Sequence, residues 1–416
     1  MAANGSTRRP RRAIVFSGGG ARGAYEAGVV RFIVDDLPRR LGHQPHIDII
    51  CGTSVGAIHA CYLAATAHQS EGRGERLVDV WRSMRLDEIF PLSVRDLLKL
   101  PRRLLGVRKI AEAMRKGAAP ERLYGLLDTV VLERVVLGAI PWKEIRNNVR
   151  EGRVDAVCIP ATQISTGRVV VFMETRDRNV PRWTRDPSIV PRPTRLLPTH
   201  ALASAAIPLL FPAVRVASTY YADGGLRLNT PLAPALRLGA DKVLVVALRQ
   251  DPAQAGEAAL ADQHVSDYGN PLYLFGKVLN ALLLDHLDTD LARMHVMNEI
   301  LAYGEKAYGD DFVEKINEAA LRERGQAFRR IDDLVIRPSA DMGRLAGQIL
   351  MNLSESQTRS ALLRFAARNI TEGDTSPESD LLSYLLFDGE FLAPLTELGY
   401  RDAQAREDEL VAFFQD

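Results

Sequence analysis

The sequence has few of the features that would cross-link the chain or anchor it in a membrane. Only three of its 416 residues are cysteines, Cys51, Cys61 and Cys158, and their spacings fit neither a disulfide framework nor a zinc site. We expect them to be free and buried. The longest apolar runs are far shorter than a membrane span, and the basic residues 1–11 precede no signal-like stretch. We therefore expect a cytoplasmic protein.

An excess of charge of one sign is also lacking. The chain has 53 Lys and Arg against 52 Asp and Glu, for a formal net charge of +1. This balance gives no reason to expect a nucleic-acid partner, and we predict none. A G-K-[ST] motif is absent as well, which excludes a P-loop nucleotide site.

The order of elements that the patterns predict is typical of an α/β fold. A buried strand, a glycine turn and a helix follow one another twice, with strands near 12–17 and 46–52 and helices near 21–37 and 54–68. This repetition predicts a parallel sheet. We divide the chain into a disordered basic tail (1–11), a core (12–250) with a helical insert at about 70–150, and a mainly helical C-terminal extension (251–416) that contains one late strand at 332–339.

The first motif is a glycine-rich loop between a strand and a helix. Gly18, Gly20 and Gly23 satisfy G-x-G-x-x-G, and such a loop turns backbone N–H groups toward something negative. That species could be a dinucleotide phosphate or a reaction oxyanion, and a plain tight turn is a third interpretation. The next strand ends in a serine turn instead of the acidic residue that would hold a ribose.

The second motif, GTSVG at Gly52–Gly56, is a G-x-S-x-G at a predicted strand-to-helix turn. A sharp turn exposes the serine hydroxyl, and small neighbours relieve the crowding. The N-terminus of the helix then favours developing negative charge. Ser54 is therefore a candidate nucleophile, although it could also merely cap the helix.

The third motif, YADGG at Tyr221–Gly225, places Asp223 at the end of a strand. Alone it is a common turn, but a serine nucleophile needs a base. His59 lies on the same predicted helix as Ser54 and should point elsewhere. The histidines that follow Asp223 could complete a Ser-Asp-His order, but none sits in a short glycine-flanked loop: His264, His286 and His295. We therefore favour direct catalysis by Ser54 and Asp223.

Together, GGGARG (Gly18–Gly23), GTSVG and DGG (Asp223–Gly225), with ASAAIP (Ala203–Pro208) between them, resemble the patatin-like phospholipase family over about residues 12–249. The resemblance implies a three-layer α/β/α fold with a mainly parallel central sheet and extra C-terminal helices. It implies a Ser54–Asp223 dyad and an oxyanion hole from the amides of Gly18, Gly19 and Gly20. The remaining glycines of these motifs would support the site: Gly23, Gly52, Gly56, Gly224 and Gly225. Arg22 would orient the loop or meet a lipid phosphate, unless it is merely a structural guanidinium that ties down neighbouring carbonyls.

The predicted function is hydrolysis of fatty-acyl esters of phospholipids or lysophospholipids, a chemistry that requires no metal or cofactor. The alternative is a non-catalytic lipid-binding or scaffold protein with a vestigial site. Residues 94–117 combine Leu, Val and Ile with many basic residues. Such a segment could make peripheral contact with an anionic membrane at its inner face, or it could form the solvated face of a helical cap. Head group, chain length, oligomeric state and any activator stay open.

Overall fold

The computed structural model describes residues 9–86, 133–134, 138–176, 187–208, 210–251, 286–352 and 383–415. Residues 1–8 of the predicted tail (1–11), the basic segment at 94–117, most of the predicted insert and His264 lie outside these residues. The three cysteines are free and buried, as expected. Within the described ranges, no helix is both long and apolar enough to cross a bilayer.

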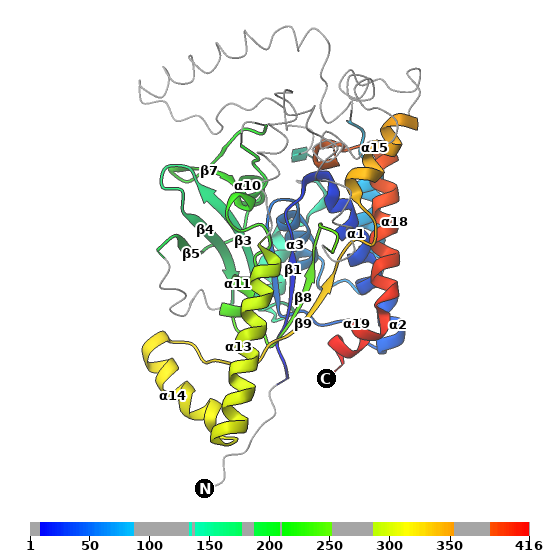
Figure 1. Cartoon of the computed structure of the whole chain (residues 1–416). Helices are drawn as coiled ribbons and strands as arrows, with labels where there is room; N and C mark the ends of the chain where they lie inside the picture. Colours follow the sequence, from blue (N-terminus) through cyan, green and yellow to red (C-terminus); the bar gives the residue numbers. More distant parts are fainter. Residues whose placement is uncertain are drawn as a thin grey trace, which may run out of the picture.

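A nine-stranded sheet organises the molecule (Figure 1). Its main path runs β5-β4-β3-β2-β1-β8-β9, with β7 paired to β3 and β6 paired to β7. Every neighbouring pair on that path is parallel except β3–β4. The mainly parallel sheet predicted from sequence is therefore confirmed. The strands are β1 (Arg12–Phe16), β2 (Ile49–Gly52), β3 (Ala156–Gln163), β4 (Val169–Thr175), β5 (Ile189–Pro193), β6 (Val214–Val216), β7 (Thr219–Asp223), β8 (Lys242–Val246) and β9 (Asp332–Ile336).

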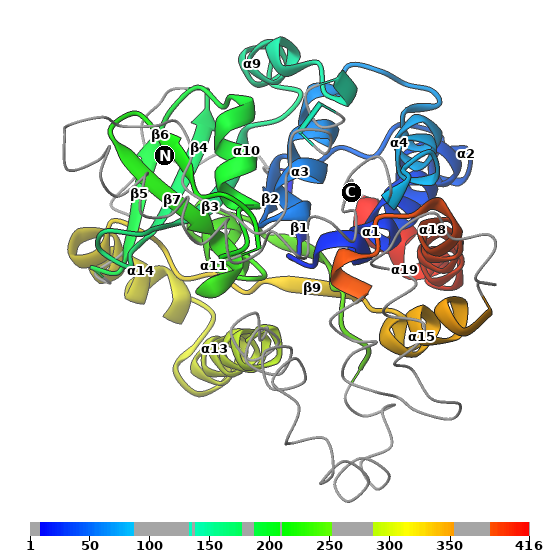
Figure 2. The ribbon, with the colours of Figure 1, turned by 90° about the horizontal axis from the view of Figure 1, so that it is seen from above.

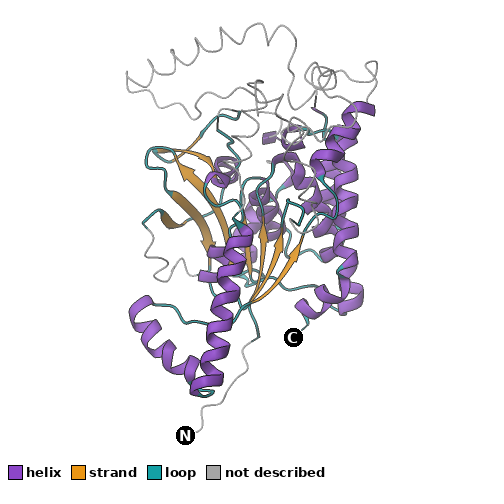
Figure 3. Cartoon of the chain, in the orientation of Figure 1, coloured by secondary structure: helices purple, strands orange, loops and turns teal. Residues whose placement is uncertain are grey.

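Helices cover both faces of this sheet, because side chains alternate along each buried strand. On β1, Ile14 and Phe16 belong to one apolar cluster, while Ala13 and Val15 belong to another. The first cluster is completed by α1 (Gly23–Arg31), α3 (Val55–Ala65), α4 (Arg73–Arg82), α9 (Trp142–Arg150), α10 (Pro198–Ser204), α15 (Met342–Asn352), α18 (Gly389–Ala405) and α19 (Glu407–Phe414). The second is completed by α11 (Leu232–Arg237) and α13 (Leu287–Tyr308). Figures 2 and 3 show these helices flanking the strands.

The predicted helix at 21–37 is longer and less regular than its sequence pattern indicates. A 3-10 turn at Gly20–Arg22 precedes α1, and a π turn at Phe32–Asp36 separates α1 from α2 (Leu37–Leu41). Helices α13 and α14 (Phe312–Arg324) form a helical hairpin.

The C-terminal part of the chain is built into the core. Strand β9 pairs in parallel with β8, and α18 lies along α1 (Figure 1). The two helices approach closely at a glycine on each: a Cβ atom on Gly28 would lie 1.9 Å from the Thr396 carbonyl oxygen, and one on Gly399 would lie 2.0 Å from that of Tyr25. The division at residue 250 stays a prediction, since the sheet itself extends beyond it.

Candidate active site

Ser54 occupies a strained turn between β2 and α3. Its backbone has φ +56° and ψ −122°, a left-handed region that costs a side-chain-bearing residue about 1–3 kcal/mol. The turn also needs glycine on both sides: a Cβ atom on Gly52 would lie 2.0 Å from the Gly56 carbonyl oxygen, and one on Gly56 would lie 2.7 Å from that of Phe16. The GTSVG pattern thus has the geometry that exposes a serine hydroxyl at the end of a strand.

The Ser54 hydroxyl meets the carboxylate of Asp223. Ser54 Oγ donates to Asp223 Oδ2 at 2.7 Å, and the Gly225 amide donates to Oδ1 at 2.7 Å. Antiparallel pairing of β3 with β7 aligns Ala161 with Asp223, so the sheet itself carries the aspartate to the serine turn. The structure therefore brings together the two residues that the sequence singled out.

Burial tunes the acidity of this carboxyl group. Asp223 is 1 % exposed, and desolvation raises its pKa to about 7, against the opposing effect of the hydrogen bonds from Ser54 and Gly225. Burial disfavours the charged form, while donors to the carboxylate favour it. A carboxylate that titrates near neutral pH is well matched to accepting a hydroxyl proton.

The described histidines make other contacts. His59 Nδ1 lies 2.7 Å from Glu26 Oε2, and His295 Nε2 lies 2.7 Å from Asp333. His200 folds back on the backbone of Leu197. Among the histidines that the structure describes, none is hydrogen-bonded to Ser54 or Asp223, and His59 points away from the serine as predicted.

The glycine-rich loop lies directly beside Ser54. A Cβ atom on Gly18 would lie 3.2 Å from that of Ser54, and Gly20, at φ +56°, lines the same pocket as the serine. The Gly18 amide donates to the Asn229 carbonyl at 3.1 Å. Within the described part of the chain, no group accepts a hydrogen bond from the amides of Gly19 or Gly20. Two N–H groups of the three predicted are thus available to an anion.

Arg22 turns away from the pocket and fixes the loop to the C-terminal part of the chain. Its Nε donates to Ser383 Oγ at 2.7 Å, and Nη1 donates to the Tyr384 hydroxyl at 3.3 Å. The guanidinium stacks 4.1 Å above the Tyr384 ring. Of the predicted roles, these contacts correspond to orienting the loop.

The other glycines of the motifs permit close packing around the site. A Cβ atom on Gly23 would lie 2.3 Å from Val55 Cγ2, and one on Gly224 would lie 2.3 Å from the Pro160 carbonyl oxygen. The glycine-rich loop therefore packs against the first residue of α3, and the aspartate turn packs against the backbone of β3.

Sequence reasoning missed Ser204 as a residue of the site. Its hydroxyl accepts the Ser54 backbone N–H at 2.9 Å and donates to the Pro160 carbonyl at 2.7 Å. The bridge connects α10, the strained serine turn and β3. The available signal was the ASAAIP block, which contains Ser204.

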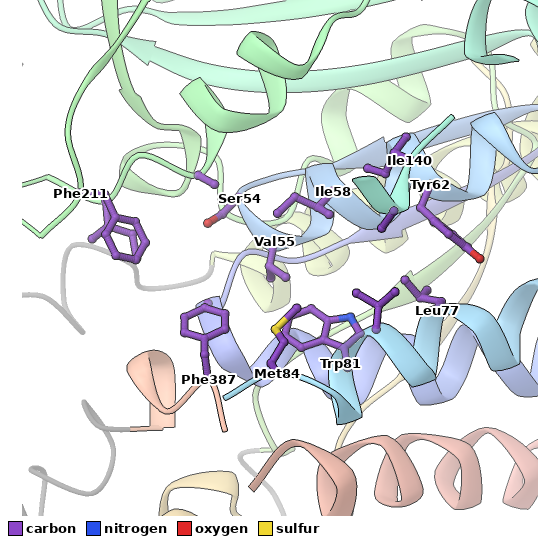
Figure 4. A pocket seen from close by; sticks show the side chains of 15 residues that line it. Ser54, Val55, Ile58, Tyr62, Leu77, Trp81, Met84, Ile140, Phe211 and Phe387 are labelled. Carbon is purple, nitrogen blue, oxygen red and sulfur yellow. The ribbon is translucent and has the colours of Figure 1, made fainter. Parts of the chain in front are cut away.

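An apolar pocket begins at Ser54 (Figure 4). Its free volume is only about 50 Å³. Its side chains come from α3, from α4 and the residues just after it, from the loop between α10 and β6, and from the segment before α18. They include Val55, Ile58, Trp81, Met84, Phe211 and Phe387. Such a lining suits a hydrocarbon chain better than a polar group.

Comparison with known proteins agrees with this geometry. A sequence model described as patatin-like phospholipase matches residues 14–236, more than half of the chain. The protein belongs to the patatin-like phospholipase family. The expected family and its mostly parallel α/β fold are therefore confirmed.

Two curated relatives are both named cGAMP-activated phospholipase. The one from Pseudomonas aeruginosa (strain BWHPSA011 / Pa011) is 29% identical over 221 residues, which cover 52% of this chain and 53% of the relative. The one from Escherichia coli (strain TW11681) is 27% identical over 231 residues, 54% of each chain. The matched part thus spans about half the length of these relatives.

Among solved structures, human GIVD cytosolic phospholipase A2 in complex with methyl gamma-linolenyl fluorophosphonate aligns with a TM-score of 0.41 and 13% identity, over 97% of this chain and 59% of that one. VipD from Legionella pneumophila aligns with a TM-score of 0.32 and 12% identity, over 96% of this chain and 67% of that one.

Proposed function

We propose that this protein is a serine acyl hydrolase that cleaves fatty-acyl esters of phospholipids or lysophospholipids. The observation that carries the proposal is the 2.7 Å hydrogen bond from Ser54 Oγ to the buried carboxylate of Asp223, at the mouth of an apolar pocket. Membership of a lipid-hydrolase family supports the class of substrate.

In the proposed reaction, Asp223 accepts the Ser54 hydroxyl proton as Oγ attacks the ester carbonyl carbon. The amides of Gly19 and Gly20 donate to the oxyanion, and one such donor is typically worth about 3 kcal/mol of barrier. The ester C–O bond then breaks, and Asp223 returns the proton to the departing alcohol. Water attacks the acyl-serine with Asp223 again as base, which releases the fatty acid.

The resting site is narrow for such a substrate. A free volume of about 50 Å³ admits an acyl chain only if the pocket walls separate. Both curated relatives bear a name that states activation by cGAMP, and we extend the proposal to an enzyme that an activator opens. Peripheral contact of residues 94–117 with anionic membranes stays part of the proposal.

The first test combines active-site labelling with lipid hydrolysis. Wild type, Ser54→Ala and Asp223→Asn are treated with a fluorophosphonate probe and assayed for fatty-acid release from neutral and anionic phospholipid vesicles, with and without cGAMP. We expect wild type to label and to release fatty acid. Ser54→Ala should lose both, and Asp223→Asn should fall about 10³-fold because the proton acceptor is gone.

The matched control is Ser83→Ala, which removes an exposed hydroxyl at the end of α4 and should label like wild type. A wild type that binds vesicles but neither labels nor hydrolyses under any of these conditions would support the vestigial lipid-binding alternative. Full activity of Asp223→Asn would show that another group is the base.

A further inference from the structure

Three buried polar side chains form a hydrogen-bonded chain behind the pocket, separate from the serine and aspartate. Glu26 of α1 and His59 of α3 are joined at 2.7 Å through Oε2 and Nδ1. His59 Nε2 in turn accepts the Trp81 indole N–H from α4 at 3.0 Å. Glu26 and His59 are completely buried, and Trp81 is 4 % exposed. Helices α1, α3 and α4 are thereby tied together at one point.

The indole fixes where the protons lie along this chain. An indole nitrogen can only donate, so His59 Nε2 must accept, and the neutral imidazole carries its proton on Nδ1. Glu26 Oε2 therefore accepts from His59. Burial lowers the pKa of His59 to about 3, which agrees with the neutral imidazole that the indole donor requires. Burial also raises the pKa of Glu26 well above its usual range.

Trp81, at the far end of these hydrogen bonds, forms a wall of the apolar pocket that begins at Ser54. The Trp81 indole lines the pocket that starts at Ser54 (Figure 4). On one side its ring stacks with Phe387, with centroids 6.2 Å apart and planes at 15°. The position of the indole is thus set by the His59 acceptor at its polar edge and by Phe387 across its face.

We propose that Trp81 is a specificity-determining residue for the acyl chain and that Glu26 and His59 are positioning residues that set its angle. This inference rests on the proposed hydrolysis of fatty-acyl esters. Most of the other pocket walls are apolar, although the Tyr62 hydroxyl donates to the Arg73 carbonyl at 2.6 Å. An indole N–H that loses its buried acceptor is left unsatisfied at a free-energy cost, and this cost favours rotation of the ring toward another acceptor. In so narrow a pocket, rotation of the largest wall residue changes the room for distal methylenes.

Chain-length dependence separates this role from general stability. We compare kcat and KM for four-carbon and twelve-carbon p-nitrophenyl esters in His59→Leu and Glu26→Leu, which break the chain, and in His59→Gln and Glu26→Gln, which keep an acceptor or donor. In the leucine variants we expect the twelve-carbon to four-carbon ratio of kcat/KM to fall about tenfold, mainly through KM. The glutamine variants should stay within about twofold of wild type.

Thr66→Val is the matched control, because it removes another buried hydrogen bond of α3, from Thr66 Oγ1 to the Tyr62 carbonyl. It should lower stability without changing the chain-length ratio. Trp81→Phe removes the N–H donor together with one ring of the indole, and it should change the chain-length ratio even where the leucine variants fold poorly.

A spectroscopic readout does not depend on turnover. Of the three tryptophans, Trp81 donates to His59, whereas the buried indole nitrogen of Trp142 has no partner among the described residues. The ¹⁵N–¹H indole cross-peak of Trp81, assigned with Trp81→Phe, should shift in His59→Leu and Glu26→Leu and stay in place in Thr66→Val.

The following outcomes would overturn the inference. Equal losses of kcat/KM on both esters would show that the hydrogen bonds joining Glu26, His59 and Trp81 only stabilise the structure. An unmoved Trp81 cross-peak in His59→Leu would show that Trp81 does not depend on a hydrogen bond to His59. A wild type that cleaves both esters, with an unchanged ratio in the leucine variants, would contradict this inference alone. A wild type that cleaves neither ester would contradict the proposed function as well.

Discussion

Asp223 must be buried to meet Ser54 and must be charged to act as a base. Burial raises its pKa from 3.8 to about 7 in the folded protein, while the unfolded chain keeps the ordinary value. Between these two pH values the folded state therefore binds more protons than the unfolded state. The contribution of Asp223 to the free energy of unfolding has its full value below about pH 4 and is lost as the pH rises through about 7.

Two pH profiles follow from this one carboxyl group. We expect kcat/KM to rise with an apparent pKa near 7, since only the carboxylate accepts the proton. We expect Asp223→Asn to be inactive yet more resistant to urea at pH 8, by on the order of 3 kcal/mol. At pH 3.5 the gain should vanish, because the carboxyl is then protonated in both states. Equal effects of the substitution at both pH values would contradict the linkage.

Local patterns singled out Ser54 and Asp223 but not the groups that hold them. Ser54 and Asp223 each stand in a short glycine-flanked motif whose geometry is decided within five residues. By contrast, Ser204 reaches Ser54 across 150 positions of sequence, and the Asn229 side chain donates to the Gly18 carbonyl across 211. Such contacts depend on how elements pack, which no local pattern records.

At the scale of elements, the contact of α1 with α18 depends on two glycines. Alanine in a helix is normally favoured over glycine by about 1 kcal/mol. Whether a glycine-to-alanine substitution raises or lowers the free energy of unfolding here therefore depends on whether a steric clash outweighs this gain. At Gly28 and Gly399 the added Cβ would lie within about 2 Å of a backbone carbonyl oxygen of the facing helix, and backbone cannot move aside as a flexible side chain can. The cost of this steric clash therefore exceeds the gain in helix propensity.

We therefore expect Gly28→Ala and Gly399→Ala each to lower the free energy of unfolding by about 3 kcal/mol through separation of the two helices. The matched control is Gly138→Ala, since no atom of the described residues lies within 4 Å of the added Cβ there, and its stability should equal or exceed that of wild type. Urea unfolding of the three variants is the measurement. Stabilisation by either of the first two substitutions would contradict the close packing.

Element types were more predictable than element positions. The strand at 332–339 was recognisable from its β-branched residues, and β9 lies within it. Its place beside β8 was not predictable, because pairing is decided by the whole sheet. Likewise, the apolar face of α18 indicates burial without naming α1 as the partner.

At the scale of the whole molecule, the two ends of the described chain are joined. The buried guanidinium of Arg12, on the central strand β1, donates from Nε to the Phe413 carbonyl at 3.1 Å and from Nη2 to that of Gln415 at 2.9 Å. At the opposite end of β1, Arg22 rests on Ser383 and Tyr384. The C-terminal residues thus support both ends of the strand that leads into the glycine-rich loop.

Truncation tests this arrangement. A chain that ends at residue 382 lacks α18, α19 and the partners of Arg22, and it should lose fluorophosphonate labelling and aggregate because the apolar face of α1 is uncovered. A chain that ends at residue 406 lacks only α19, so it should melt earlier than wild type but still label Ser54. Circular dichroism melting and labelling together distinguish the two, and normal labelling of the shorter chain would contradict the dependence.

The contacts between Arg22 and the C-terminal residues also have a consequence for translation. Ser54 and Asp223 leave the ribosome well before Ser383 and Tyr384, so a nascent chain carries its nucleophile and base while the neighbouring loop still lacks its support. We expect such a chain to be inert toward lipids during synthesis.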